Sequence, residues 1–258
     1  MHQYALILGG SSGLGLATVK ALGRDGWGIL VVHRDRKSTL PAIQEAFSEI
    51  ATNAPDFGSF NVDALQADKR SDLIEAIQNQ IGEKGRIGVV VHSIAKGNLK
   101  PMAGGDGPYL QSDDFQLTLA AMATSLYDWV QALFQAELFA SDTRIISFTS
   151  EGNQKAWPNY GAVSAAKAAL EAITRQIALE FAPYGIRANC IQAGTTDTPS
   201  LRLIPGHERL MEISRQRNPF DRLTRPEDVA AVVSLLVRPD AAWINGAVIP
   251  VDGGEHLQ

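Results

Sequence analysis

The sequence is poor in cysteine: Cys190, in the apolar run 188–191, is the one thiol among 258 residues. A lone cysteine cannot form an intramolecular disulfide, which excludes a secreted scaffold held by disulfides and favours a reducing compartment. Free cysteines in apolar runs usually act as small buried hydrophobes. We therefore expect Cys190 to be a packing residue rather than a catalytic thiol.

Basic charge and long apolar runs are scarce as well. Lysine and arginine number 23 against 28 acidic residues, and a net charge of -5 opposes a general attraction to nucleic acid or anionic lipid. The longest apolar stretch, 229–237, is interrupted by Ser234 and is about half as long as a membrane span. The first residues lack the basic start and cleavage site of a secretory signal. We expect a cytoplasmic protein without nucleic-acid partners, membrane partners or a metal site.

The sequence does contain a regular alternation of two kinds of segment. Short runs rich in branched apolar residues alternate with longer segments of helical period. Such alternation implies parallel strands joined by right-handed crossovers, in a sheet covered on both faces. We therefore predict a single-domain, doubly wound α/β fold of the Rossmann type over 1–258, with helices on both faces. About seven strands are expected, at 4–8, 28–32, 59–65, 88–92, 144–148, 187–192 and 247–251.

Two irregular stretches interrupt the alternation, at 97–108 and 195–221. Both follow the carboxyl ends of strands, where open α/β sheets bind their ligands. Apolar residues in the second stretch are expected either to form a lid over the site, around 195–221, or to pack in the core. They are Leu201, Leu203, Ile204, Leu210, Met211 and Ile213.

A glycine-rich segment directly follows the first strand and leads into a helical run. Gly9 permits a tight turn, Gly13 lets backbone N–H groups approach a pyrophosphate, and Gly15 allows close packing of helix against strand. At the start of a βαβ unit this pattern predicts dinucleotide binding. The residues expected to contact the cofactor here are Gly9, Ser11, Ser12, Gly13, Leu14 and Gly15.

The spacing Gly-x-x-x-Gly-x-Gly resembles the short-chain dehydrogenase/reductase superfamily, and the resemblance extends over nearly the whole chain. The segments 225–228 and 249–254 look like its C-terminal signatures. The resemblance implies that Asp68, with Lys69 beside it, contacts the adenine after the third strand.

The catalytic tyrosine and lysine of this superfamily usually lie four residues apart, but Tyr160 and Lys167 lie seven apart. Seven helical positions make about two turns, so both side chains share one helix face, about 10 Å apart along the axis. This spacing and the segments 157–160 and 166–172 resemble the family's enoyl-acyl carrier protein reductases. The resemblance implies that Tyr160 hydrogen-bonds the developing enolate oxygen and that Lys167 binds the nicotinamide ribose.

Two further segments differ from the ketone reductases of the superfamily. The residues His92, Ser93, Ile94 and Ala95 stand where ketone reductases carry Asn-Asn-Ala-Gly, and 122–125 lacks their tetrad asparagine. Both departures resemble the enoyl reductases. They imply that Ser93, Ile94 and Ala95 line the cofactor site.

Ser150 departs from the enoyl reductase pattern. Many of these enzymes carry a second tyrosine ten residues before the catalytic one, and Ser150 occupies that position. It resembles the serine that ketone reductases place after the fifth strand. We expect Ser150 either to assist Tyr160 or to cap the following turn.

The loop after the sixth strand begins at Gly194 and resembles the family's Pro-Gly loop with threonine replacing proline. The resemblance implies that Thr196 and Thr198 bond the pyrophosphate or the nicotinamide amide. The segment beyond is locally basic, which indicates either a solvated face or a docking surface for an acidic acyl carrier protein or the phosphates of coenzyme A. Its arginines are Arg202, Arg209, Arg215, Arg217, Arg222 and Arg225.

The choice of cofactor depends on the residues after the second strand. NAD-specific members usually place an acidic residue where His33 stands, and NADP-specific members place an arginine where Arg34 stands. Arg36 and Lys37 add positive potential, whereas Asp35 lies in the same turn and several enoyl reductases with the longer spacing use NADH. We expect NADPH, with NADH as the alternative.

The expected activity is NAD(P)H-dependent reduction of an enoyl thioester, as in the enoyl-acyl carrier protein reductases of fatty acid synthesis. Ser150 favours the alternative, a 3-oxoacyl or other carbonyl reductase. A third hypothesis, a non-catalytic NADP-binding sensor, requires neither Tyr160 nor Lys167. The resemblance implies a homotetramer, because related folds bury the outer faces of the helices near 124–140 and 160–181 against symmetry mates. Both segments are rich in alanine and large apolar residues, which fits such an interface.

Overall fold

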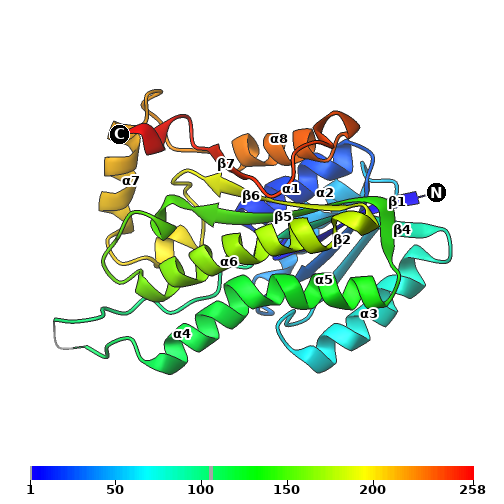
Figure 1. The fold of residues 1–258 in the computed structure, drawn as a ribbon, viewed down its shortest axis with the longest axis horizontal. Helices are drawn as coiled ribbons and strands as arrows, with labels where there is room; N and C mark the ends of the chain where they lie inside the picture. Colours follow the sequence, from blue (N-terminus) through cyan, green and yellow to red (C-terminus); the bar gives the residue numbers. More distant parts are fainter. Residues whose placement is uncertain (1, 105–106) are drawn as a thin grey trace.

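The structure is a computed structural model that describes residues 2–104 and 107–258. Seven parallel strands of these residues form one sheet through the middle of the molecule (Figure 1). Their order is β3-β2-β1-β4-β5-β6-β7, the doubly wound order, so the predicted fold class is confirmed. The strands are β1 (His2–Leu8), β2 (Gly28–His33), β3 (Phe57–Asn61), β4 (Gly85–His92), β5 (Phe139–Ser150), β6 (Ile186–Ala193) and β7 (Val248–Val251).

Helices cover both faces of this sheet (Figure 1). One face carries α1 (Gly13–Arg24), α2 (Leu40–Ala51) and α8 (Pro226–Leu236). The other carries α3 (Ala67–Ile81), α6 (Gly161–Glu180) and a long helix made of α4 (Ser112–Leu119), one π-helical turn η1 (Ala120–Thr124) and α5 (Ser125–Gln135). Short 3-10 turns are η2 (Glu151–Asn153), η3 (Ala182–Tyr184), η4 (Leu201–Leu203), η5 (Pro239–Ala241) and η6 (Glu255–Leu257).

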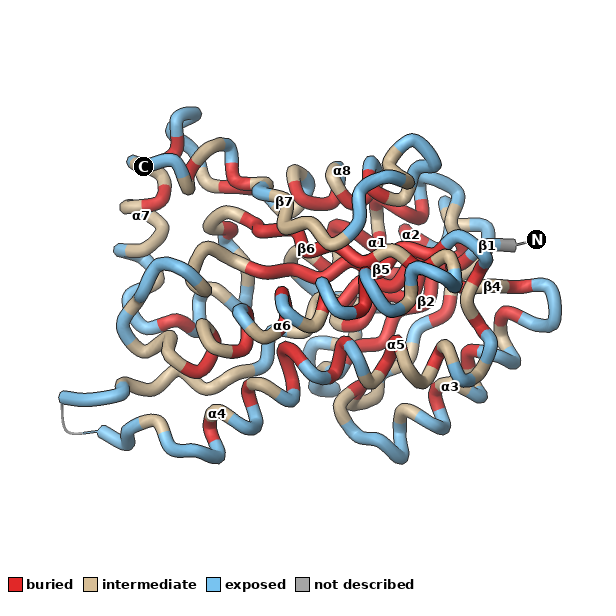
Figure 2. Tube along the Cα trace, viewed as in Figure 1, coloured by how far each residue is buried: buried red, intermediate tan, exposed pale blue. Residues whose placement is uncertain are grey.

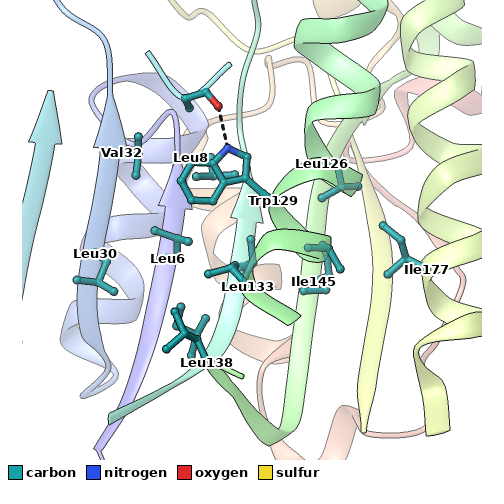
Figure 3. Packing of buried hydrophobic residues seen from close by; sticks show 14 of the residues in the cluster. Leu6, Leu8, Leu30, Val32, Leu126, Trp129, Leu133, Leu138, Ile145 and Ile177 are labelled. Atoms are coloured by element: carbon teal, nitrogen blue, oxygen red, sulfur yellow. Dashed lines mark hydrogen bonds between the residues drawn. The ribbon is translucent and has the colours of Figure 1, made fainter. Parts of the chain in front are cut away.

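The sheet is buried between two apolar layers, and Figure 2 shows the buried residues concentrated there. Successive strand residues point to opposite faces, so Leu6 and Leu8 enter one layer while Ile7 enters the other. Trp129 of α5 is fully buried over the first layer, and its Nε1–H donates to the Ala64 carbonyl at 3.0 Å (Figure 3). This bond satisfies the indole and fixes the chain just after β3.

Some predicted boundaries were wrong. The helix expected near 124–140 begins at Ser112 and ends at Gln135, because β5 already starts at Phe139. The stretch 195–221 is not irregular throughout, since it contains η4 and α7 (His207–Arg217). Within the stretch 97–108, Gly105 and Asp106 lie outside the described residues.

Membrane-spanning helices were also sought over 2–104 and 107–258. None of the helices there has the length and apolar character that crossing a bilayer requires.

Candidate active site

A cavity of about 710 Å³ opens at the carboxyl ends of the strands. It lies where the crossovers from β1 and β4 diverge to opposite faces, the usual ligand position in this fold. Most of the predicted site residues line it, and Gly15, Asp68 and Lys69 do not. Those that line it are Gly9, Ser11, Ser12, Gly13, Leu14, Arg34, Ser93, Ile94, Ala95, Ser150, Tyr160, Lys167, Gly194, Thr196 and Thr198.

The glycine loop forms a cradle at one side of the cavity. Gly9 has φ +87°, and a Cβ there would lie 2.5 Å from the Ser93 carbonyl oxygen. Gly15 packs under the loop, where a Cβ would lie 2.1 Å from the Gly9 oxygen. Helix α1 has no acidic residue in its first turn, and Ser12 makes no side-chain capping bond. The positive end of the helix is therefore available to an anion such as a pyrophosphate.

Asp68 and Lys69 lie away from this cradle. Strand β3 ends at Asn61, four residues earlier than expected, so Asp68 falls in the first turn of α3, where it is exposed, and Lys69 pairs with Asp72 at 3.7 Å. Asp63 lines the cavity instead. The apolar residues Val62, Ala64 and Leu65 suggested a longer strand, but they belong to the loop. Asp63 could have been found from its place just after the end of β3. The resemblance of 67–69 to the family motif pointed to Asp68 instead.

Arg34 has one acidic neighbour that the sequence analysis missed, Asp63, besides Asp35 in its own turn. Its Nη1 donates to Asp63 Oδ2 at 2.8 Å, and His33 Nδ1 lies 2.8 Å from Asp35 Oδ2. Burial alone would raise the pKa of Asp63, but bonds from the Leu65 N–H and Arg34 prevail and lower it. Asp35 and Asp63 both line the cavity, so negative charge is present beside Arg34 although His33 replaces the usual acid.

Tyr160 and Lys167 face the same cavity from the start of α6. Tyr160 is the residue just before the helix, and Lys167 follows two turns later. The Lys167 ammonium donates to the Phe148 carbonyl at 2.6 Å. Burial lowers the pKa of Lys167 to about 8, against the opposing effects of Cys190 and Glu171. A nearly buried ammonium thus lines the same cavity as the tyrosine.

The Tyr160 hydroxyl lies 3.5 Å from Ser150 Oγ. Burial raises the pKa of Tyr160, and the Ser150 bond lowers it by less. The phenol therefore stays protonated near neutral pH and can donate a hydrogen bond. Sequence reasoning missed Gly152: a Cβ there would lie 2.6 Å from Tyr160 Cε1, so the ring needs a glycine beside it.

His92 lies behind the site rather than in it. Its ring is buried, and Nε2 lies 2.7 Å from Ser125 Oγ, which donates its own proton to the Ala121 carbonyl at 2.8 Å. Nε2 is therefore the protonated nitrogen that donates to Ser125. Burial and then the Lys167 charge lower the pKa of His92 to about 3. A neutral histidine thus joins β4 to α5.

Apolar side chains form part of the cavity lining, and we call them the apolar wall. Among the six residues expected to form a lid, Met211 alone does not line it. Ile204 is buried whereas Leu203 is 71% exposed, so the segment packs partly inward and partly over the opening. The apolar wall consists of Leu99, Met122, Trp157, Val163, Leu201, Leu203, Ile204, Leu210 and Ile213.

Most of the positive charge near α7 is already paired within the chain. Four of the six arginines form ion pairs, which leaves Arg209 and Arg225 without one among the described residues. The locally basic segment is therefore closer to neutral than its sequence indicates. The pairs are Arg202 with Asp197, Arg215 with Glu212 and Asp221, Arg217 with Glu151, and Arg222 with Asp228.

Metal-binding groups were sought as well. Over the described ranges, 2–104 and 107–258, no three or more His, Cys, Asp or Glu side chains gather where they could hold a metal ion.

Comparison with known proteins identifies the family of the chain. A family model described as Enoyl-(Acyl carrier protein) reductase matches residues 9–256. The chain belongs to this family of short-chain dehydrogenases/reductases. It is an oxidoreductase of that superfamily, as the resemblance of its motifs implied.

The similar proteins include more than one kind of reductase. The chain is 28% identical to 1-cyclohexenylcarbonyl-CoA reductase of Streptomyces collinus, over 98% of this chain and 86% of the relative. It is 29% identical to the 3-oxoacyl-[acyl-carrier-protein] reductase MabA of Mycobacterium bovis, over 98% and 93%. The crystal structure of an enoyl-[acyl-carrier-protein] reductase (NADH) from Aquifex aeolicus VF5 superimposes with a TM-score of 0.83 at 25% identity, covering 100% of this chain and 97% of that one.

Proposed function

We propose that this short-chain dehydrogenase/reductase reduces the 2,3 double bond of an enoyl thioester, with a nicotinamide dinucleotide as the reductant. The observation that carries the proposal is the placement of Tyr160 and Lys167, two helical turns apart at the start of α6 and both lining one cavity. In this reaction hydride is added at C3 while negative charge develops on the thioester oxygen at C1. A hydroxyl donor must therefore stand further from the hydride donor than in ketone reduction, where both act on one carbonyl.

The cavity fits the dinucleotide that the proposal requires. The glycine cradle has no space for side chains and presents the amino end of α1, which suits a pyrophosphate. Lys167 would hold the ribose hydroxyls next to the nicotinamide, and Ser93, Ile94, Ala95, Gly194, Thr196 and Thr198 line the space around it. When bound, the reduced cofactor supplies the hydride.

The chain's own catalytic contribution is a hydrogen bond at the substrate oxygen. Because burial keeps the Tyr160 phenol protonated, it can donate to the enolate oxygen as charge develops there. A single donor of this kind is worth about 3–4 kcal/mol of transition-state stabilisation. The Lys167 ammonium adds positive potential from below while its bond to the Phe148 carbonyl fixes its position.

The apolar wall around Met122, Val163, Ile204 and Ile213 suits an acyl chain that excludes water from the reacting bond. Pairing of the arginines near α7 weakens the case for docking an acidic acyl carrier protein on them. The thioester is therefore proposed by its chemistry, on either coenzyme A or acyl carrier protein.

Carbonyl reduction is the second candidate. The 3.5 Å contact between Ser150 Oγ and the Tyr160 hydroxyl favours it, because ketone reductases of the superfamily use a serine beside the tyrosine. The similarity to a 3-oxoacyl reductase supports it too. A sensor without catalysis is the weakest candidate, since it needs neither Tyr160 nor Lys167.

NADPH is the proposed cofactor, with NADH as its rival. Arg34 lines the cavity, and its Nε and Nη2 make no ion pair with the described residues, so it can still bond a 2′-phosphate while Nη1 is held by Asp63. Asp35 and Asp63 oppose this preference by their charge.

Steady-state kinetics test the proposal. Oxidation of NADPH and of NADH is followed by absorbance with crotonyl-CoA and, separately, with acetoacetyl-CoA; acyl carrier protein thioesters of the same acyl groups follow. The proposal predicts a kcat/KM for crotonyl thioesters at least about tenfold above that for acetoacetyl thioesters. The reverse preference would assign carbonyl reduction, and no turnover of either would favour the sensor.

A further inference from the structure

A buried carboxylate that the proposed chemistry does not use lies directly behind the catalytic pair. Glu171 follows Lys167 by one turn on α6, is 8% exposed, and does not line the cavity. Burying a carboxylate costs free energy unless hydrogen bonds compensate for the lost water. The partners of Glu171 therefore indicate what this position holds in place.

Both of its described partners belong to the segment that follows β5. Glu171 Oε1 accepts from Thr149 Oγ1 at 2.7 Å and also accepts from Asn153 Nδ2. Thr149 is in the last residues of β5, and Asn153 ends the turn η2. One carboxylate oxygen thus ties both ends of a short chain reversal to α6, which packs along β5 and η2 (Figure 1).

The tied segment contains the residues that meet the Tyr160 ring. Ser150, whose Oγ lies 3.5 Å from the Tyr160 hydroxyl, directly follows Thr149, and Gly152 directly precedes Asn153. The close approach at Gly152 leaves no room for a Cβ against the ring. A shift of this turn would therefore move the surface on which the phenol rests.

Lys167 holds the same segment one residue earlier, through the Phe148 carbonyl at 2.6 Å. Lys167 and Glu171 thus fasten consecutive residues, Phe148 and Thr149, to successive turns of α6. Lys167 itself lines the cavity, whereas Glu171 reaches it only through the turn.

We propose that Glu171 is a positioning residue that holds the turn 149–153, and with it Ser150 and Gly152, against Tyr160. The inference rests on the proposed function for its effect on turnover but not for its effect on the turn. A misplacement of about 1 Å in a reacting group can cost on the order of a hundredfold in rate.

The first experiment measures amide hydrogen exchange in the purified full chain, without substrate. Glu171→Met, which has no acceptor oxygen, should speed exchange in the peptide covering 149–155, and Asn153→Ala should do the same. Glu171→Gln keeps an oxygen at the same reach and should restore protection. Glu180→Met, an exposed change at the end of the same helix, is the matched control and should match wild type. Unchanged exchange in both Glu171→Met and Asn153→Ala overturns the inference whatever the substrate is.

The second experiment measures kcat with the thioester that wild type reduces, alongside the dissociation constant of NADPH. Glu171→Met should lower kcat by at least about tenfold with cofactor affinity within about twofold of wild type, and Glu171→Gln should recover most of the loss. In a Tyr160→Phe background the same change should cost less than about twofold, because residues that act as a unit are not additive. If Glu171→Met lowers kcat by the same factor in the Tyr160→Phe background as in wild type, Glu171 does not act through Tyr160. A fall in cofactor affinity equal to that of Lys167→Ala would contradict the proposal as well. If wild type reduces neither thioester, the proposed function fails while the exchange result still decides the inference.

Discussion

At the scale of single residues, the two groups proposed for catalysis have different surroundings and different roles. Tyr160 offers one hydroxyl to the cavity, and burial keeps it protonated. Lys167 brings a charge that burial disfavours, since its pKa falls to about 8. Loss of the hydroxyl should therefore affect chemistry, and loss of the ammonium should affect binding as well.

Tyr160→Phe is expected to lower turnover by at least about tenfold with little change in cofactor affinity, because it removes only the proposed hydrogen bond to the substrate oxygen. Lys167→Ala is expected to weaken cofactor binding as well, because it removes the ribose contact and a neighbouring charge. Steady-state kinetics and a fluorescence titration with NADPH measure both quantities. Equal losses of cofactor affinity in the two variants would contradict these roles.

Arg34 is expected to select the cofactor. A charge-assisted bond to a 2′-phosphate is worth about 1.5–3 kcal/mol, which corresponds to a preference of roughly ten- to a hundredfold. Arg34→Ala should lose that factor in kcat/KM for NADPH and leave NADH almost unaffected. Asp63→Asn, which removes the charge paired with Arg34 at 2.8 Å, should increase the preference for NADPH. If wild type uses NADH as well as or better than NADPH, or if Arg34→Ala leaves kcat/KM for NADPH unchanged, Arg34 does not select the cofactor.

At the scale of secondary-structure elements, apolar patterning located the strands because every central strand is buried on both faces. It placed the end of β3 wrongly because Val62, Ala64 and Leu65 are apolar without being strand residues. The expected adenine contact, Asp68, therefore does not line the cavity, whereas Asp63 does. Helix α7 was missed because its arginines and glutamates hide the helical period.

The contacts of Glu171 with Thr149 and Asn153 join positions 22 and 18 residues apart, and no local pattern encodes them.

His92 makes the junction between β4 and α5 sensitive to acid. Its pKa is lowered to about 3, so between about pH 3 and pH 6.5 the unfolded chain binds a proton there that the folded chain does not. The stability it contributes is present above pH 6.5 and is lost as the pH falls. The free energy of unfolding of wild type, relative to His92→Gln, should drop by about 1.4 kcal/mol per pH unit below about pH 6. Urea denaturation at pH 7, 6 and 5 checks this, and parallel pH profiles would contradict it.

At the scale of the whole molecule, large apolar side chains remain exposed on several elements, and two groups of them bear on assembly. Leu117, Tyr127 and Leu179 lie on α4, α5 and α6, where the family resemblance implied a paired-helix interface. Elsewhere, Leu235 lies on α8, and Trp243, which is 97% exposed, lies after the end of that helix. A tetramer of dihedral symmetry needs two different interfaces, and we assign one to each of these two groups of side chains.

A homotetramer is therefore the expected assembly, formed through both surfaces. Light scattering after gel filtration should give a mass near four chains, and Leu179→Glu, which places a charge on the first surface, should give a smaller species. The exposed Glu180→Gln is the control. A wild-type mass near the 27.8 kDa of one chain at micromolar concentration would rule the tetramer out.

The central claim, that this cavity directs hydride to C3 of an enoyl thioester, is tested most directly by following the hydride itself. Crotonyl-CoA is incubated with the enzyme and with NADPH carrying deuterium at C4 of the nicotinamide, in each of the two stereochemical labels, and the product is examined by mass spectrometry and NMR. We predict butyryl-CoA with one deuterium at C3 from one of the two labels, with the second hydrogen, at C2, coming from solvent. Intact crotonyl-CoA, together with deuterated 3-hydroxybutyryl-CoA from acetoacetyl-CoA under the same conditions, would contradict it.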